Sequence, residues 1–366
     1  FCADASDRDD AHGLPEDGEG GPGEADEPGL YDPSCEIGDD REKADFASSL
    51  EGIALSADPR AKRVRTASLA EAVEEVVLQN SRGRERSQRA SSYFASLETV
   101  AEDAGEGQTG YGFGFARRFG DLSAASIARE SVGRALRMLG ARPLPTGRYP
   151  AVLENGAAAD LLDVIAPSFL APQVAKGKSM FAGRIGRAVG SALVEIVDDP
   201  LDAEGSGAAA FDGEGVPTRR NVLVREGVLA SFLSDTFWGR KIGTATTGSL
   251  RRPSAKSPPA VGAWGLRLAA GRRSVEGMLK DLGGGVILKE FLGIHTADPV
   301  SGDFSVGASG VRFEGGEEKE PVRGFAVSGN VLSLLRDVTA VGNDFRWFGS
   351  TGSPSLAVSR VEIGGA

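Results

Sequence analysis

The chain has 366 residues, of which 40% are hydrophobic and 25% are charged, and its formal net charge is −11. This length favours two lobes or one large domain, and the composition is that of a soluble globular chain. No apolar run approaches the ~20 residues that a membrane-spanning helix needs, so such a span is excluded.

The first 40 residues are strongly acidic. They contain 14 Asp or Glu and one Arg, whereas residues 41–366 contain 38 Asp or Glu and 40 Lys or Arg. Gly and Pro are interleaved with these acids, so the segment has too little apolar surface to offset the entropy lost on ordering. We therefore predict a disordered segment over 1–40, with an acidic interaction arm as the alternative. The opening residues lack an initiator Met and a secretory signal, so we expect a fragment or a processed chain.

The next part, residues 41–150, is predicted to be the remainder of an α/β domain. Apolar residues recur at helical spacing until Asp58-Pro59, where a proline ends the helix. A β-like tract follows, with a turn at Asn80–Gly83. Aromatic residues occupy every second position of 110–115, which predicts a strand with a buried aromatic face. A second helix is predicted from about 123 to 139.

The third part, residues 151–366, is predicted to be rich in strands. A short strand at 151–153 leads into an Ala- and Leu-rich helix. Short β segments punctuated by Gly are expected at 191–197, 220–225, 228–233, 262–268, 285–296, 303–313, 322–328 and 355–363. Short helices are expected at 235–242, 274–281 and 330–337. The fold class is thus α+β, with a helix/strand N-terminal part followed by a large, curled, barrel-like, mostly antiparallel β lobe.

The residues that usually carry chemistry are scarce. The only cysteines, Cys2 and Cys35, lie in the acidic segment, so no disulfide can form within residues 41–366. A reducing cytoplasmic location is therefore expected. Two His residues, His12 and His295, are too few for a metal site built on several imidazoles. The acids between 198 and 214 lack calcium-loop spacing and are interpreted as a solvated loop.

Other common functions find little support. Gly177-Lys178-Ser179 follows Pro172 where a phosphate loop needs Gly. The chain has no Gly-x-Ser-x-Gly elbow for a serine hydrolase. A cluster of Arg residues spans 82–89, but the body is nearly neutral, so nucleic-acid binding is not expected.

Several short strings occur in the order seen in the TldD/PmbA family. They lie at 211–217, 246–248, 301–310, 341–344 and 353–356. The resemblance covers roughly residues 31–366. The chain most closely resembles the PmbA branch, also called TldE, whose members have been described as modulators of DNA gyrase and as part of a metalloprotease system. Six positions of these strings are expected to be structural, namely Asp212, Glu214, Gly215, Gly248, Asn343 and Asp344.

The resemblance implies that this chain binds no metal. The TldD branch carries a His-Glu-x-x-x-His helix, in which two His bind the metal and the Glu serves as base. The matching stretch here, Leu153–Asp160, contains no His, and 347–352, which matches the region of a further Cys ligand, contains no Cys. The family's preceding N-terminal α/β lobe is also missing. No catalytic or metal-binding residue is therefore assigned, and zinc is expected in a TldD-like partner.

The implied function is that of a non-catalytic subunit in a cytoplasmic heterodimer that degrades or processes unfolded or extended peptides. Gly302, Asp303 and Ser305 are the candidates for a peptide groove, together with His295, because small residues allow a peptide backbone to approach a strand edge. A Gly-rich hairpin turn and a strand-end histidine are the alternatives at these positions. A stand-alone protein-binding module and a hydrolase with an unrecognised site also remain open, as does the choice between homodimer and heterodimer.

Overall fold

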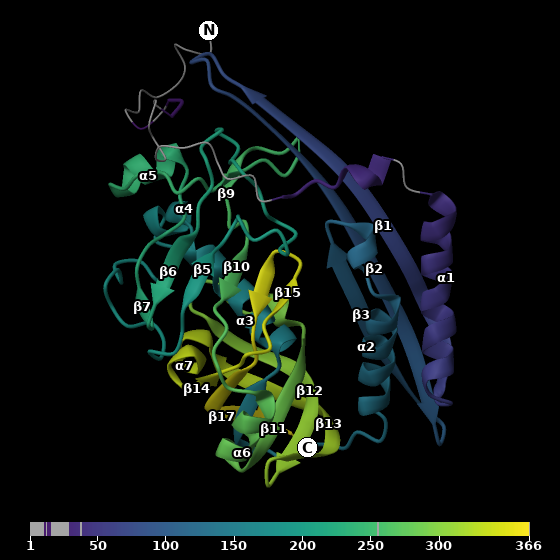
Figure 1. Ribbon diagram of the computed structural model, residues 1–366. Coiled ribbons are helices and arrows are strands. Elements are labelled where there is room, and N and C mark those ends of the chain that lie inside the picture. The colour runs from purple at the N-terminus through teal and green to yellow at the C-terminus, as the bar shows by residue number, and fades with distance from the viewer. Residues whose placement is uncertain (1–10, 12, 16–28, 37–38, 255, 366) are drawn as a thin grey trace.

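The computed structural model describes residues 11, 13–15, 29–36, 39–254 and 256–365. The chain forms two lobes that lie side by side (Figure 1). The N-terminal lobe consists of α1 (Asp40–Ala57), β1 (Ala61–Gln79), β2 (Glu85–Asp103), β3 (Glu106–Ala116) and α2 (Ala124–Arg137). The C-terminal lobe runs from β4 (Gly147–Leu153) to β17 (Leu356–Gly364). No helix of the described part of the chain is long and apolar enough to cross a membrane.

The N-terminal lobe is an antiparallel sheet of order β1-β2-β3, against which α1 and α2 pack. Helix α1 begins after Asp39, whose side chain accepts a hydrogen bond from the Arg41 N–H, and ends before Pro59, as predicted. The predicted turn between β1 and β2 is confirmed. Its Asn80 Oδ1 accepts from the Arg82 and Arg84 N–H groups, while Gly83 adopts φ +80°.

The prediction for β3 is wrong about which of its faces is buried. Its glycines, not its aromatic residues, face α2. A Cβ at Gly110 would lie 2.1 Å from the Ser131 carbonyl oxygen, and one at Gly112 would lie 2.3 Å from the Ile127 oxygen. Because the helix backbone approaches this closely, only glycine fits on that face. The aromatic side chains consequently point away from α2, and Tyr111 is 43% exposed.

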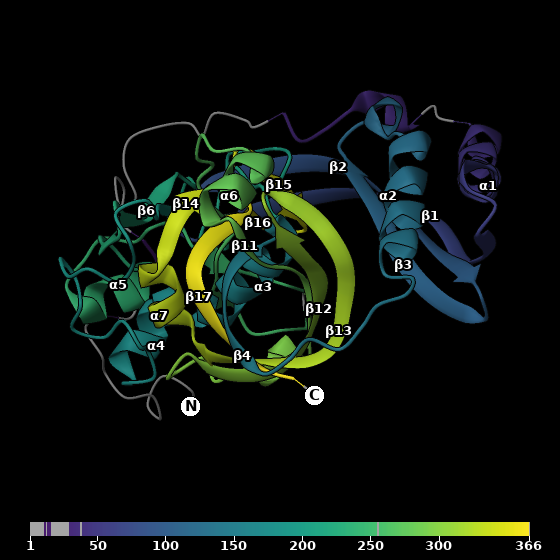
Figure 2. The same cartoon turned by 90° about the horizontal axis from the view of Figure 1, so that it is seen from below.

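The C-terminal lobe contains a closed barrel of five strands, which confirms the predicted α+β class and barrel-like lobe. The strand order is β13-β12-β11-β4-β17, and β13 pairs with β17 to close the ring. All pairs are antiparallel except β4 and β11. Figure 2 shows the ring seen along its axis. The remaining barrel strands are β11 (Gly284–Leu292), β12 (Asp303–Glu314) and β13 (Glu317–Asn330), with β14 (Val338–Val341) beside β17.

A second sheet, of order β15-β16-β10-β5-β6-β7, lies above the barrel in Figure 1. Its strands are β5 (Ile196–Asp198), β6 (Asn221–Arg225), β7 (Val228–Leu229), β10 (Leu266–Leu268), β15 (Arg346–Phe348) and β16 (Thr351–Ser353). The other elements are the pair β8 (Leu250–Arg251) and β9 (Ala260–Val261), and the helices α3 (Asn155–Ile165), α4 (Ala171–Ala175), α5 (Thr236–Ile242), α6 (Val275–Leu282) and α7 (Val331–Arg336).

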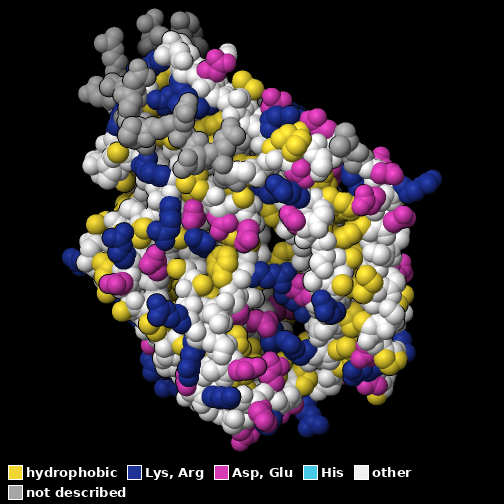
Figure 3. Space-filling model, viewed as in Figure 1, with side chains coloured by type: hydrophobic (Ala, Val, Ile, Leu, Met, Phe, Trp, Pro, Cys, Tyr) yellow, Lys and Arg dark blue, Asp and Glu magenta, His cyan; other side chains and the backbone are white. Residues whose placement is uncertain are grey.

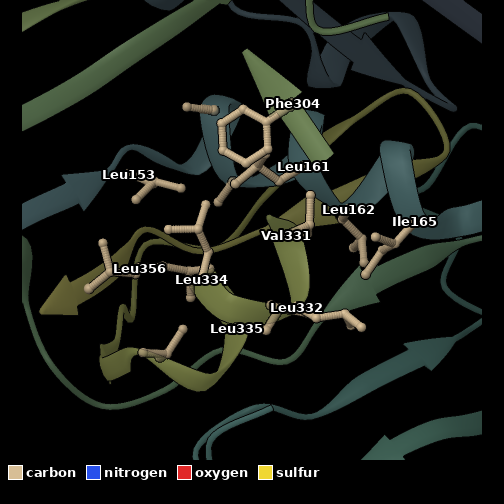
Figure 4. Close-up of a cluster of buried hydrophobic side chains, with 14 of the residues drawn as sticks. Leu153, Leu161, Leu162, Ile165, Phe304, Val331, Leu332, Leu334, Leu335 and Leu356 are labelled. Atoms are coloured by element: carbon tan, nitrogen blue, oxygen red, sulfur yellow. The ribbon is translucent and has the colours of Figure 1, made fainter. Parts of the chain in front are cut away.

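Helix α3 joins the barrel to the second sheet. It contacts β11 of the barrel as well as β10 and β16 of the sheet. Figure 4 shows its buried residues Leu161, Leu162 and Ile165 packed with side chains of α7 and with Leu153. One large apolar core thus joins the barrel to the second sheet and fixes the position of α3, while a smaller cluster packs α6 against the barrel.

Residues 29–36 pack against β2, so the predicted disorder of 1–40 does not hold for them. The Ser91 N–H donates to the Leu30 carbonyl, and the Asp32 N–H donates to Ser91 Oγ. Glu36 pairs with Arg89 at 2.5 Å. These bonds offset the loss of chain entropy that the composition suggested. Residues 1–10, 12, 16–28 and 37–38, including Cys2 and His12, lie outside the described residues.

Candidate functional site between the lobes

A cavity of about 670 Å³ separates the two lobes. Strand β3 and helix α2 form one wall, and the start of α3, with β11 and β12, forms the other. Figure 3 shows the hollow between the lobes with charged side chains along it. The cavity is therefore built from both lobes, and α3 contributes Gly156 and Asp160 to it.

Aromatic side chains form one part of the cavity wall. Tyr111 and Phe113 project from β3 because its glycines occupy the opposite face, and Phe348 projects from β15. The ring centroids of Phe113 and Phe348 lie 5.9 Å apart. The Arg346 guanidinium lies 4.3 Å from the Phe113 ring centroid, a cation–π distance. This wall suits apolar or planar groups.

Charged side chains form the opposite part of the wall. Lys289 Nζ lies 2.5 Å from Glu154 Oε1, and an Arg137 nitrogen lies 3.7 Å from the same oxygen. The Lys289 side chain is only 13% exposed, so this pair is screened less than a surface ion pair. Glu154 is thereby held by two cations that come from other elements.

Two further carboxylates line the cavity without such partners. Burial, followed by repulsion from Asp163 and Glu290, raises the pKa of Asp160 to about 6. Neither Asp160 nor Glu290 forms an ion pair with a basic residue among the described residues. The cavity thus offers acidic groups as well as an aromatic wall.

The walls of the cavity are fixed by polar contacts between the lobes. Both terminal nitrogens of Arg346 donate to the Glu130 carboxylate, at 2.5 and 2.9 Å, and one also donates to the Phe113 carbonyl. At the other side of the interface, Arg117 donates to the carbonyls of Ala203 and Gly205. Bidentate pairing of this kind orients the two lobes as well as attracting them.

The predicted groove residues lie elsewhere, and none of the four lines this cavity. Gly302 is in the turn before β12, Asp303 and Ser305 are at the start of β12 itself, and His295 lies in a short 3-10 helix at 294–296. Gly302 adopts φ +82° and its N–H donates to the Asp298 carbonyl. The Asp303 carboxylate accepts from the Asn330 side chain. Ser305 and His295 are exposed. The turn is thus internally hydrogen-bonded, and its part in binding a peptide stays a prediction.

The family-motif residues near position 212 form a buried polar network. The Asp212 carboxylate accepts from the N–H groups of Glu214, Val216 and Leu250, and burial raises its pKa to about 7. Glu214 accepts from the N–H and hydroxyl of Thr236. Asp198, Asp199 and Asp212 are buried. The interpretation of the 198–214 acids as a solvated loop is therefore wrong for these three. Backbone N–H groups donate to Asp212 and to Oδ1 of Asp198, and arginine pairs with Asp199, whereas Oδ2 of Asp198 is buried without a hydrogen-bond partner among the described residues.

The other motif residues also hold loops in place. Gly215 and Gly248 adopt φ +73° and +72°. The Gly248 carbonyl accepts from the Trp264 indole. Asp344 accepts from the N–H and hydroxyl of Ser355, and the Asn343 N–H donates to the Arg273 carbonyl. A structural role for the six motif positions stays a prediction.

The residues that the structure describes do not fit a metal site. Within the described ranges, no group of three or more His, Cys, Asp or Glu is placed to hold a metal ion. Of the residues on and beside α3, Glu154 is engaged by Lys289 and Arg137, and Asp160 faces the cavity without a second ligand of the nitrogen or sulfur type.

Sequence reasoning missed most of the cavity. Tyr111 and Phe113 belong to a strand whose alternating pattern the sequence shows, but the aromatic face was predicted to be the buried one, whereas the glycine face packs against α2. Glu154 lies within the stretch compared with the TldD motif, Leu153–Asp160, yet its partners Arg137 and Lys289 come from elements that no local pattern connects. The signal that could have found the aromatic wall was the run of alternate glycines in 110–114.

Comparisons with known proteins agree with this architecture. Residues 146–365 match the PmbA/TldA metallopeptidase C-terminal domain, and residues 39–139 match the PmbA/TldA metallopeptidase central domain. The metalloprotease PmbA of Escherichia coli O157:H7 is 26% identical over 325 residues, which cover 88% of this chain and 70% of that protein. A metalloprotease TldD homolog of Haemophilus influenzae is 27% identical over 349 residues, which cover 88% and 72%.

Solved structures show the same fold. A Thermotoga maritima protein described as a modulator of a DNA gyrase matches with a TM-score of 0.89 and 30% identity, covering 96% of this chain and 80% of that chain. TldE of Thermococcus kodakarensis matches with a TM-score of 0.87 and 24% identity, covering 99% and 82%, and so supports the fold alone. The predicted resemblance is confirmed, and the chain belongs to the PmbA/TldD metallopeptidase family.

Proposed function

We propose that this chain is a PmbA/TldE-type, non-catalytic subunit of a cytoplasmic metalloprotease complex that degrades or processes extended peptides. The observation that carries the proposal is the composition of α3 where it faces the interlobe cavity. Gly156 and Asp160 line the cavity there, and Glu154 is neutralised by Lys289. A helix of this kind serves binding better than metal chemistry, so zinc is assigned to a TldD-like partner.

In this proposal the interlobe cavity binds the peptide and the partner cuts it. Tyr111 and Phe348 would contact apolar side chains of the peptide, and Asp160 and Glu290 would accept hydrogen bonds from its N–H groups or an amine. Polar contacts between the lobes hold these groups in place, so little ordering is needed on binding.

The test is reconstitution with a TldD-like subunit from the same organism. Peptide cleavage by the mixture should exceed cleavage by either chain alone, and replacing the partner's His-Glu-x-x-x-His histidines should abolish the gain. Tyr111→Ala should reduce the gain, whereas Arg148→Ala, an exposed change on the barrel, should preserve it. Cleavage by this chain alone would favour the hydrolase alternative. A partner that cleaves equally well alone would refute the subunit role.

A further inference from the structure

A second groove lies between the β1–β2 hairpin and the C-terminal lobe. It has a volume of about 530 Å³ and is distinct from the interlobe cavity, with which it shares no lining residue. Figure 1 shows the hairpin reaching over the top of the C-terminal lobe near β9. The hairpin is anchored there, because the Ala210 N–H donates to Gln88 Oε1 and Arg84 donates to the Gly215 carbonyl. These hydrogen bonds hold the hairpin against the C-terminal lobe and so fix the shape of the groove.

The groove reaches the free edge of a sheet. Among the residues that the structure describes, strand β1 pairs only with β2, and its other edge has no strand beside it. Residues 76–79 all line the groove, although neighbouring side chains of a strand point to opposite faces. The groove therefore extends along the edge of β1 as well as over one face. An edge strand carries unpaired N–H and C=O groups that can pair with an added strand.

The wall beside this edge is apolar. Val76 and Val77 are 38% and 60% exposed, which is high for aliphatic side chains in a strand. Across the groove lie Phe211, Pro253 and the indole of Trp264. A ligand that covered these groups would remove apolar surface from water.

The groove also contains two guanidinium groups. Arg251 lies 4.8 Å from the Trp264 ring centroid and donates to the Ala263 carbonyl, while Arg252 donates to the Gly213 carbonyl. Neither forms an ion pair with a carboxylate in the described part of the chain. The acids of the groove are Glu74 and Asp212, and the Asp212 carboxylate already accepts three backbone hydrogen bonds. Arg252, which is exposed, is thus available to an acidic ligand, and the half-buried Arg251, which also feels the charge of Asp198, lies beside it.

We propose that this groove binds an extended peptide segment that combines aliphatic with Asp or Glu side chains, added as a strand along the edge of β1. The backbone pairs with the edge, the aliphatic side chains cover Val76 and Val77, and the carboxylates meet Arg251 and Arg252. This inference is independent of the function proposed for the interlobe cavity.

The probe is a labelled hexapeptide, Val-Val-Glu-Glu-Val-Val, acetylated and amidated so that only side chains carry charge. Its pattern places Val, Glu and Val on both faces of a strand, so either register presents the same groups. Fluorescence anisotropy with the full chain should show saturable binding that weakens with salt. The analogue with Lys in place of Glu should bind at least tenfold more weakly, and so should a backbone N-methylated analogue that cannot pair with an edge.

Two charge reversals locate the site. Arg252→Glu, an exposed change, should weaken binding at least tenfold, whereas Arg225→Glu, an exposed reversal at the end of β6, should leave it unchanged. Tyr111→Ala should also leave it unchanged, which separates this groove from the interlobe cavity. Equal binding of the Glu and Lys peptides, or an unaffected Arg252→Glu variant, would overturn the proposal. The proposal would also be overturned if the peptide did not bind and analytical ultracentrifugation showed a dimer, because a second copy of the chain would then occupy the β1 edge.

Discussion

Replacing Gly112 by Ala tests the packing that turns the aromatic face of β3 toward the cavity. The added Cβ would lie 2.3 Å from the Ile127 oxygen and 2.8 Å from the Ser131 nitrogen, both backbone atoms of α2. Ordinary contacts begin near 3.4 Å, so the helix must move by about 1 Å, since no side-chain rotation relieves the clash. Overpacking of this kind costs about 1–3 kcal/mol, and two backbone clashes favour the upper end.

Gly133→Ala is the matched control. Gly133 is exposed in α2, and no heavy atom lies within 4 Å of its Cβ position. Ala there should stabilise the chain by about 1 kcal/mol, because glycine is a poor residue in a helix interior. Urea unfolding followed by circular dichroism should therefore give shifts of opposite sign for the two variants. A Gly112→Ala variant as stable as the original chain would refute the close approach of β3 and α2.

Three other predictions concern the cavity and its metal content. Glu154→Gln should destabilise the chain by about 1–3 kcal/mol in urea unfolding, because it leaves the mostly buried Lys289 with Glu318 at 3.9 Å as its nearest carboxylate; Glu317→Gln, which breaks an exposed pair, should be nearly neutral. The raised pKa of Asp160 means that its ionisation opposes folding, so stability should fall as pH rises from about 4 to about 6. The fall in the free energy of unfolding should be about 1 kcal/mol after allowance for solvent screening, and Asp160→Asn should remove it. A difference in stability between the variant and the original chain that stays constant across this pH range would contradict the assignment. The dialysed chain should hold less than one zinc per molecule by elemental analysis, and one tightly held zinc would show an unrecognised site.

Local signals in the sequence were sufficient for most elements. Pro59 marks the end of α1, and Asn80 and Gly83 supply the side-chain acceptor and the positive φ that a hairpin turn needs. The Gly-punctuated segments gave the barrel strands to within a few residues, as β11 and β12 show. These features depend on contacts between near neighbours, so the sequence contains the information directly.

Features that depend on distant contacts could not be predicted. Alternation in β3 gives a period of two but does not say which face meets α2, and the close approach at Gly110 decides that. The cavity requires Arg137, Glu154 and Lys289 to meet from three elements. The sequence therefore indicated the family and the fold class, whereas the site emerged only from the arrangement of the two lobes.

The pairing of β4 with β17 has a consequence for synthesis of the protein. Val152 pairs with Ala357, about 200 residues later, and β4 lies between β11 and β17 in the barrel. At ~5–20 residues per second, a ribosome needs ~10–40 s to deliver the last strand after β4. Throughout that interval the apolar strand β4 lacks its neighbour β17, and it also lacks β11 until residues 284–292 have been made. The N-terminal lobe, whose strands pair within residues 61–116, can form early, whereas the barrel cannot close until β17 has been made and is the part exposed to chaperones and aggregation in the meantime.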